Sequence, residues 1–135
     1  MVFSVFAVLA AGTLVLIYTT RPATNLESAG VQANQLLAAA GGPVKVCDEA
    51  NQMFKRFGVT KVKFFDAAEL KDFPSLNALG MVRGIWPGSP PRISIRVGTH
   101  RNGFFFDIAD TNSPGKYPKS PDTLELVDSC VFVHR

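Results

Sequence analysis

The first 20 residues contain no charged side chain, whereas all 14 lysine and arginine residues and all 11 aspartate and glutamate residues come later. Residues 2–18, VFSVFAVLAAGTLVLIY, are almost entirely apolar. As a helix this segment would be roughly 25 Å long, close to the lower limit for crossing a bilayer core of about 30 Å. We therefore expect a single-pass transmembrane anchor in residues 1–20, which inserts in the lipid bilayer through 2–18. A linker at 21–24 would join it to one small domain at 25–135.

A cleaved signal peptide is the alternative interpretation of this segment, and it would release a secreted domain. Signal peptides normally have a basic residue before the apolar stretch and small residues at the cleavage site. Here no lysine or arginine precedes Arg21, and the candidate cleavage points place Arg21 or Glu27 where a small residue is needed. The sequence therefore favours an uncleaved anchor. It does not fix the side of the membrane that carries the domain, because Arg21 and the amino terminus flank the segment on opposite sides.

The sequence also lacks the short motifs that mark common catalytic and ligand sites. It has no Gly-rich phosphate loop, no zinc or calcium pattern and no Gly-x-Ser-x-Gly element. The net charge is +3, yet no basic run is longer than Lys55-Arg56, whereas nucleic-acid-binding proteins usually cluster their basic residues. These absences favour a non-enzymatic domain, and we expect neither a cofactor, nor a metal, nor a nucleic-acid partner.

The chain has only two cysteines, Cys47 and Cys130. Their separation fits neither a metal site nor a Cys-x-x-Cys redox motif. A disulfide between them would require an oxidising compartment. Otherwise both would be buried thiols that pack as small apolar groups. The sequence leaves these two alternatives open because it does not reveal the compartment.

The apolar pattern predicts an α+β domain. TNLE at 24–27 is typical of a capping box in which Thr24 caps a helix. Apolar residues then recur at spacings of three and four as far as residue 57, with a break at Gly41-Gly42-Pro43. We expect a helical hairpin over 25–57 that packs on a mostly antiparallel sheet of about four to five strands.

The rest of the chain alternates as strands do. A short helix that Asp66 and Glu69 begin should end before Pro74, and a polar, proline-rich loop is expected at 111–122. The C-terminal segment from residue 123 is expected to be a strand interrupted near Asp128, with a short helix at 121–128 as the alternative. The other strands are predicted at 61–65, 81–86, 92–97 and 104–109.

Asn102-Gly103 is the strongest hairpin signal, because a type I′ turn needs positive φ at both central residues. A two-residue turn there would pair Val97 with Ile108 and His100 with Phe105. One face would then be buried, formed by Ile93, Ile95, Val97, Phe104, Phe106 and Ile108. The other face would carry Arg96, His100, Phe105 and Asp107.

This second face supplies the candidate site. Asp107 would lie opposite Gly98 and diagonal to both Arg96 and His100, so that it could orient or charge His100 while Arg96 contacts an anion. A small enzyme or ligand-binding domain is therefore one functional alternative. Charge pairs of this kind also occur on the solvent-exposed face of many antiparallel sheets and contribute little to stability.

The second histidine, His134, lies next to the chain end and is expected to fray.

We expect a membrane-tethered, non-enzymatic domain that binds or scaffolds a protein partner. Tryptophan is enriched at binding hot spots, and the single Trp86 precedes the rigid loop PGSPP at 87–91. The candidate binding residues are Trp86, Arg96, His100 and Phe105. An electrostatic alternative would use Arg92, Arg96 and Arg101 to contact anionic lipid or nucleic acid.

Overall fold

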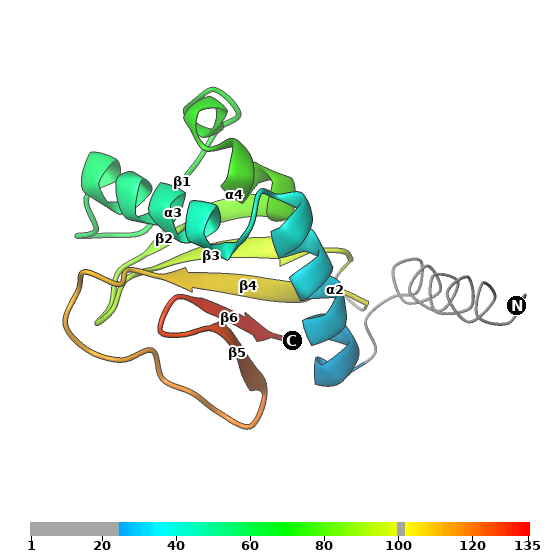
Figure 1. Cartoon of the computed structure of the whole chain (residues 1–135). Helices are drawn as coiled ribbons and strands as arrows, with labels where there is room; N and C mark the ends of the chain where they lie inside the picture. The colour runs from blue at the N-terminus through cyan, green and yellow to red at the C-terminus, as the bar shows by residue number, and fades with distance from the viewer. Residues whose placement is uncertain (1–24, 100–101) are drawn as a thin grey trace, which may run out of the picture.

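Helices cover one face of an antiparallel sheet in the computed structural model, which describes residues 25–99 and 102–135 (Figure 1). Within these residues the helices are α2 (Leu26–Ala39), α3 (Pro43–Phe57) and α4 (Pro74–Leu79), with a 3-10 helix η1 (Glu69–Asp72) before α4. The six strands lie in the order β1 (Lys63–Phe64), β2 (Met81–Trp86), β3 (Arg92–Val97), β4 (Phe104–Ala109), β6 (Val131–His134) and β5 (Thr123–Val127). The α+β class is confirmed, with more strands than predicted.

The predicted membrane anchor at 2–18 and the linker at 21–24 lie outside the described residues. Among the helices that the structure does describe, none is long and apolar enough to cross a membrane.

The N-cap of the helical hairpin is Asn25 and not Thr24, which lies outside the described residues. The Asn25 side chain accepts a hydrogen bond from the backbone N–H of Ser28 at 2.8 Å, and the Ser28 hydroxyl completes the capping box. Gly41 and Gly42 separate the two helices with φ values of 109° and 99°, a region that favours glycine. Pro43 then starts α3, where its missing N–H costs nothing.

The C-terminal segment is a hairpin and not a single strand. β5 and β6 pair with each other, and the N–H of Cys130 donates to the carbonyl of Val127 at 3.0 Å across the turn. Ser129 adopts a left-handed φ of 59° in this turn. The predicted interruption near Asp128 is therefore a chain reversal, and the alternative of a short helix at 121–128 is wrong. This reversal supplies the additional strand.

A disulfide joins the helical layer to the sheet. It links Cys47 in α3 to Cys130, the residue immediately before β6, across a sequence separation of 83. Of the two alternatives for the cysteines, the structure has the disulfide and no free thiol. Between the layers lies the apolar core, which includes Met53, Phe73, Ile95 and Phe106.

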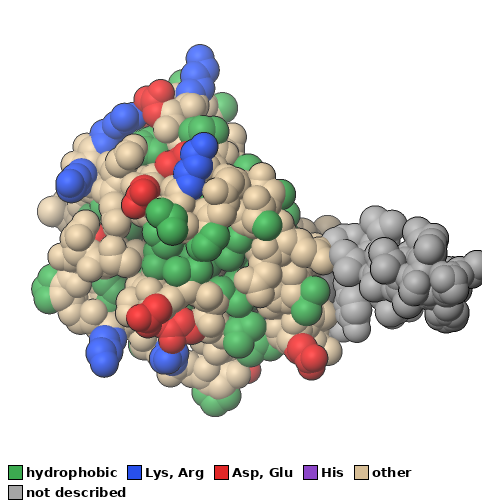
Figure 2. Space-filling model, viewed as in Figure 1, with side chains coloured by type: hydrophobic (Ala, Val, Ile, Leu, Met, Phe, Trp, Pro, Cys, Tyr) green, Lys and Arg blue, Asp and Glu red, His purple; other side chains and the backbone are tan. Residues whose placement is uncertain are grey.

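Basic and acidic side chains are interspersed on the face of the molecule that Figure 2 shows. In the view of Figure 1, Figure 2 shows hydrophobic side chains gathered near the centre, with lysine, arginine and carboxylate side chains around them. Val44 in α3 and Val31 in α2 are 74% and 39% exposed.

Helix α4 depends on a carboxylate from another helix. Pro74 begins α4, although a helix was predicted to end before this proline. The N-cap residue Phe73 provides no side-chain hydrogen bond. Glu49 of α3 is buried and accepts hydrogen bonds from the N–H groups of Ser75 at 2.9 Å and Leu76 at 3.1 Å. These N–H groups belong to the first turn, which has no partners within its own helix.

Replacing Glu49 with alanine is expected to lower the free energy of unfolding by about 2–3 kcal/mol, because two buried N–H groups lose a charged acceptor. Urea unfolding measures this difference. Asp48→Ala, at an exposed position of the same helix, is the matched control and should change stability by less than about 0.5 kcal/mol. Equal effects of the two substitutions would show that Glu49 does not cap α4.

Candidate functional site

The β3–β4 hairpin has a longer connection than predicted. Val97 pairs with Phe104 and Arg96 with Phe105, so residues 98–103 form the connection. The predicted pairing of Val97 with Ile108 is wrong by four positions. Gly98, with φ of 81°, follows the last residue of β3, and Asn102-Gly103 precede β4 instead of forming a two-residue turn. Because four is an even number and side chains alternate with a period of two, the residues of β3 and β4 still lie on their predicted faces.

We call the sheet surface opposite the helices the helix-free face. The predicted binding residues Trp86, Arg96 and Phe105 all lie on it, whereas His100 lies outside the described residues. Cross-strand partners form three rows on this face: Met81–Arg96–Phe105–His134, Gly84–Ser94–Asp107–Phe132 and Trp86–Arg92.

Asp107 is the centre of a charged cluster on the helix-free face. Its side chain is only 4% exposed, and its Oδ2 atom lies 3.1 Å from His134 Nε2 and 3.6 Å from Arg92 Nε. The same oxygen accepts a hydrogen bond from the Tyr117 hydroxyl. Arg92, not Arg96, forms the ion pair with Asp107. The residue opposite Asp107 is Ser94 and not Gly98.

His134 is the histidine that Asp107 contacts, and the expectation that it frays is wrong. It lies in β6, opposite Phe105 of β4 and Thr123 of β5. Its imidazole stacks on the Phe105 ring, with centroids 5.3 Å apart. The alternation of Val131, Phe132, Val133 and His134 was the sequence signal that could have extended the strand to this position.

The long loop predicted at 111–122 carries Tyr117 to the cluster. The Tyr117 ring stacks on Phe132 at a centroid distance of 4.1 Å, which covers this part of the helix-free face. Ser89 fastens the same loop through a hydrogen bond from its hydroxyl to the Pro114 carbonyl at 3.0 Å. No local pattern of the sequence indicates that the loop returns to Asp107.

The contacts of Asp107 shift the pKa values of its neighbours. The hydrogen bond to Asp107 raises the pKa of His134 above its usual value, although burial acts in the opposite direction. A hydrogen bond with the Arg135 backbone also raises the His134 pKa. Burial, followed by the bond to Asp107, raises the pKa of Tyr117 far above its usual range. The cluster therefore favours charged His134 and a neutral, donating Tyr117.

The raised pKa makes stability depend on pH. The unfolded chain titrates this histidine near pH 6.5, so the stability that the His134–Asp107 contact contributes is fully present below about pH 6.5. It is lost as the pH rises through the higher folded pKa. Wild type should therefore lose more unfolding free energy than His134→Gln between about pH 6 and pH 9. Urea unfolding across this range measures the difference, and His100→Gln is the control. Parallel pH profiles of wild type and His134→Gln would contradict this assignment.

A pocket of about 230 Å³ opens on the helix-free face beside Asp107. The Arg83 guanidinium lies 5.1 Å from the Trp86 ring centroid and 5.5 Å from that of Phe105. Within residues 25–99 and 102–135, no carboxylate lies within ion-pair distance of Arg83. We call this cavity the Trp86 pocket; it is lined by Arg83, Trp86, Arg92, Ser94, Phe105, Asp107 and His134.

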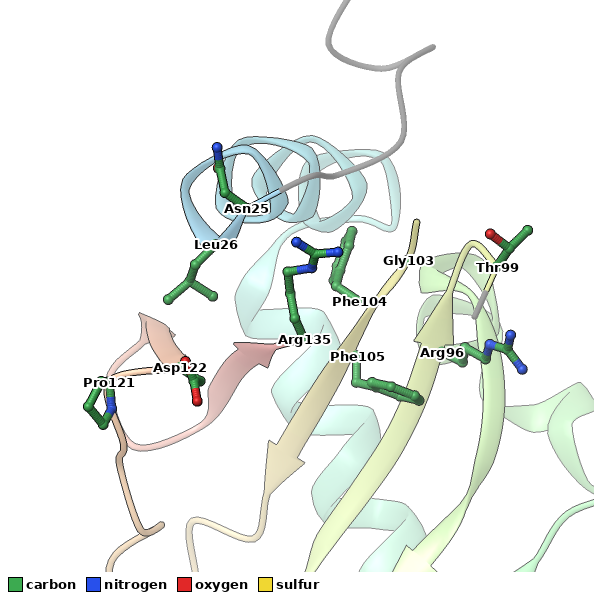
Figure 3. Close-up of a pocket in the computed structure, with 10 residues that line it drawn as sticks. All are labelled: Asn25, Leu26, Arg96, Thr99, Gly103, Phe104, Phe105, Pro121, Asp122 and Arg135. Atoms are coloured by element: carbon green, nitrogen blue, oxygen red, sulfur yellow. The ribbon is translucent and has the colours of Figure 1, made fainter. Parts of the chain in front are cut away.

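A larger pocket, of about 490 Å³, lies where α2 begins (Figure 3). Arg135 points upward beside Phe104, whereas Arg96 extends away on the other side of β4. Phe105 lines both this pocket and the Trp86 pocket. The two cavities therefore lie close together along β4.

Comparison with known proteins adds no functional information. No protein-family model matches the sequence, and neither the curated proteins nor the solved structures include a match.

Proposed function

We propose that this chain is a membrane-tethered, non-enzymatic domain that binds an acidic segment of a protein partner through the helix-free face. The observation that supports this most strongly is the combination of guanidinium groups and aromatic rings on that face. Arg83 lies over two rings, and Phe64 and Met81 remain 67% and 58% exposed. Aromatic residues, methionine and arginine are enriched at protein interfaces.

Two acidic residues of this face, Asp107 and Glu125, form ion pairs with residues of this chain. Asp107 is buried against Arg92 and His134. Glu125 of β5 forms a 2.8 Å ion pair with Lys119. Arg83 and Arg96 have no such carboxylate within the part of the chain that the structure describes. This excess of positive charge complements an acidic partner.

A protein suits this face better than a nucleic acid does. Proteins that bind single strands offer open aromatic rings on which bases stack. Here the Arg83 guanidinium covers Trp86 and Phe105, His134 stacks on Phe105, and Tyr117 stacks on Phe132. Phe64 is 67% exposed, but it lies on the edge strand β1, away from the stacked rings on β4 and β6. The disulfide also favours an oxidising compartment, outside the cytosol.

The Asp107 cluster suits binding better than catalysis. A general base needs an imidazole that is neutral and free to accept a proton. Nε2 of His134 instead faces Asp107, and the surrounding hydrogen bonds favour the protonated form. The cluster therefore stabilises a positive charge on the helix-free face.

The tether follows from the apolar segment 2–18, with the domain on the oxidising side of the membrane. Four linker residues span at most about 14 Å. The start of α2 at Leu26 would consequently be held close to the bilayer surface, and the domain would meet membrane-bound or nearby partners.

Binding of a labelled peptide to the full chain in lipid nanodiscs tests this proposal. The probe is a 12-residue peptide of alternating glutamate and leucine, and the matched probe has glutamine in place of glutamate. We expect saturable binding of the acidic peptide alone, weakened by salt. Arg96→Glu should weaken it at least tenfold. Lys71→Glu, at an exposed position of η1, should have little effect, and circular dichroism verifies that both variants fold.

Three results would overturn the proposal. The first is equal binding of the glutamine peptide. The second is an equal effect of Lys71→Glu and Arg96→Glu. The third is a preference for oligothymidine or for anionic lipid vesicles over the acidic peptide, which would assign the face to nucleic acid or to lipid.

A further inference from the structure

Positive groups converge on the Trp86 pocket from three strands. Arg83 comes from β2, Arg92 from β3 and His134 from β6, and all of them line the cavity. Asp107 is the acidic group in the lining, and it is buried against Arg92 and His134. The lining therefore retains an excess of positive charge, to which Arg83 contributes most directly because no described carboxylate pairs with it.

The size of the pocket limits its ligand. Sites for small molecules and cofactors usually enclose about 300–1,000 Å³, whereas the Trp86 pocket has about 230 Å³. This volume suits a side chain better than a whole cofactor. Arginine presents five N–H donors in a planar fork that matches a carboxylate. Arg92 directs its Nε atom toward Asp107. Its two terminal nitrogen atoms lie on the other edge of the guanidinium group, which is the edge that can bind a second carboxylate.

An apolar surface adjoins the charged pocket. The ring of Phe64 meets Trp86 edge to face, with centroids 5.8 Å apart, and Phe64 is 67% exposed. Gly84 allows this approach, because a Cβ atom there would lie 2.2 Å from the Lys63 carbonyl oxygen. β1 can therefore run close against β2 and place Phe64 beside the pocket.

We propose that the Trp86 pocket is a carboxylate-binding site that takes one glutamate or aspartate side chain of the partner, with a neighbouring apolar residue packed on Phe64. Arg83 and Arg92 hold the carboxylate, and the edge of Trp86 lies between the acidic and the apolar subsites. This inference rests on the proposed function and names the group that the helix-free face recognises.

Trp86 provides the readout, because it is the only tryptophan in the chain. Its fluorescence is followed in the full chain in nanodiscs during titration with acetyl-Glu-Leu-amide. The matched neutral probe is acetyl-Gln-Leu-amide, and acetyl-Leu-Gly with a free carboxyl terminus tests a terminal carboxylate. We expect the glutamate probe to change the fluorescence saturably and the glutamine probe to bind at least tenfold more weakly.

Two variants locate the effect. Arg83→Gln, at an exposed position that does not contribute to the core, should weaken the glutamate probe at least tenfold. Lys71→Gln removes a positive charge from the helical side and should leave the affinity unchanged. Equal affinity of wild type and Arg83→Gln, or equal binding of the glutamate and glutamine probes, would overturn the inference. Tighter binding of acetyl-Leu-Gly would overturn the assignment to a side chain.

The two proposals can fail separately. If the 12-residue acidic peptide still binds in an Arg96-dependent manner but the glutamate probe leaves Trp86 unchanged, the carboxylate pocket is wrong and the proposed function stands. If neither the peptide nor the probe binds, both are wrong.

Discussion

Replacing Cys47 and Cys130 together with alanine is expected to lower the free energy of unfolding by about 4 kcal/mol. The disulfide closes a loop across a sequence separation of 83, and the chain-entropy model gives about 4.5 kcal/mol for a loop of this length. Small domains are typically stable by about 5–15 kcal/mol. Loss of the bond would therefore remove a large part of the total stability and release α3 from the start of β6.

Urea unfolding under oxidising and reducing conditions measures this effect. Reduction should destabilise the wild type by a similar amount and should leave the double-alanine variant unchanged. The same bond predicts that alkylation and mass spectrometry of protein from native membranes will find both cysteines oxidised. Unfolding free energies that do not respond to reduction would contradict a structural disulfide. Two alkylated thiols would contradict the proposed oxidising compartment.

Replacing Asp107 with alanine is expected to lower the free energy of unfolding by about 3 kcal/mol or more. The carboxylate is buried and compensates the charges of Arg92 and His134, while it also accepts the Tyr117 hydrogen bond. The substitution removes a charged acceptor from both Tyr117 and His134, and hydrogen bonds to charged groups contribute about 1.5–3 kcal/mol each. Arg92 and His134, whose side chains are 38% and 30% exposed, recover part of their hydration. Hydrogen exchange should also accelerate across 111–122, because Tyr117 loses its anchor.

The control is an ion pair between two solvent-exposed side chains. Asp72 lies 2.7 Å from Arg56, and the two side chains are 65% and 48% exposed. Asp72→Ala should cost no more than about 1 kcal/mol. Asp107→Asn keeps an acceptor for Tyr117 but removes the negative charge. The stability of this variant should therefore lie between those of Asp107→Ala and the wild type. The pKa of His134 should move back toward its usual value. A cost for Asp107→Ala no larger than that for Asp72→Ala would show that the cluster does not support the fold.

The location of residues on one or the other face of the sheet could be predicted from the sequence. Alternation along a strand is a local property, so Phe105 and Asp107 were placed correctly on the face opposite the core even though the turn was wrong. The register could not be predicted in the same way. The Asn-Gly pair suggested a two-residue turn, but the chain leaves β3 at Gly98 and returns only at Phe104.

For the candidate site too, the sequence predicted the face but not the contacts. The sequence indicated Trp86, Arg96, Phe105 and Asp107 as members of one surface. It assigned the wrong partners to Asp107, because Arg92, Tyr117 and His134 reach that carboxylate through strand register, a returning loop and a C-terminal hairpin. The N-cap of α2 was predicted one residue too early, at Thr24 instead of Asn25, because neighbouring polar residues compete for one capping position.

The sequence by itself determined the α+β class, the helical hairpin, the inward and outward faces of the strands and the scarcity of catalytic motifs. These features depend on the spacing of apolar residues within single elements and on short motifs. Only the tertiary structure decided that Cys47 bonds Cys130, that Glu49 caps α4 and that Asp107 meets His134. Each of these contacts joins residues from separate elements, and its energy exists only after the layers have packed and brought the two groups together.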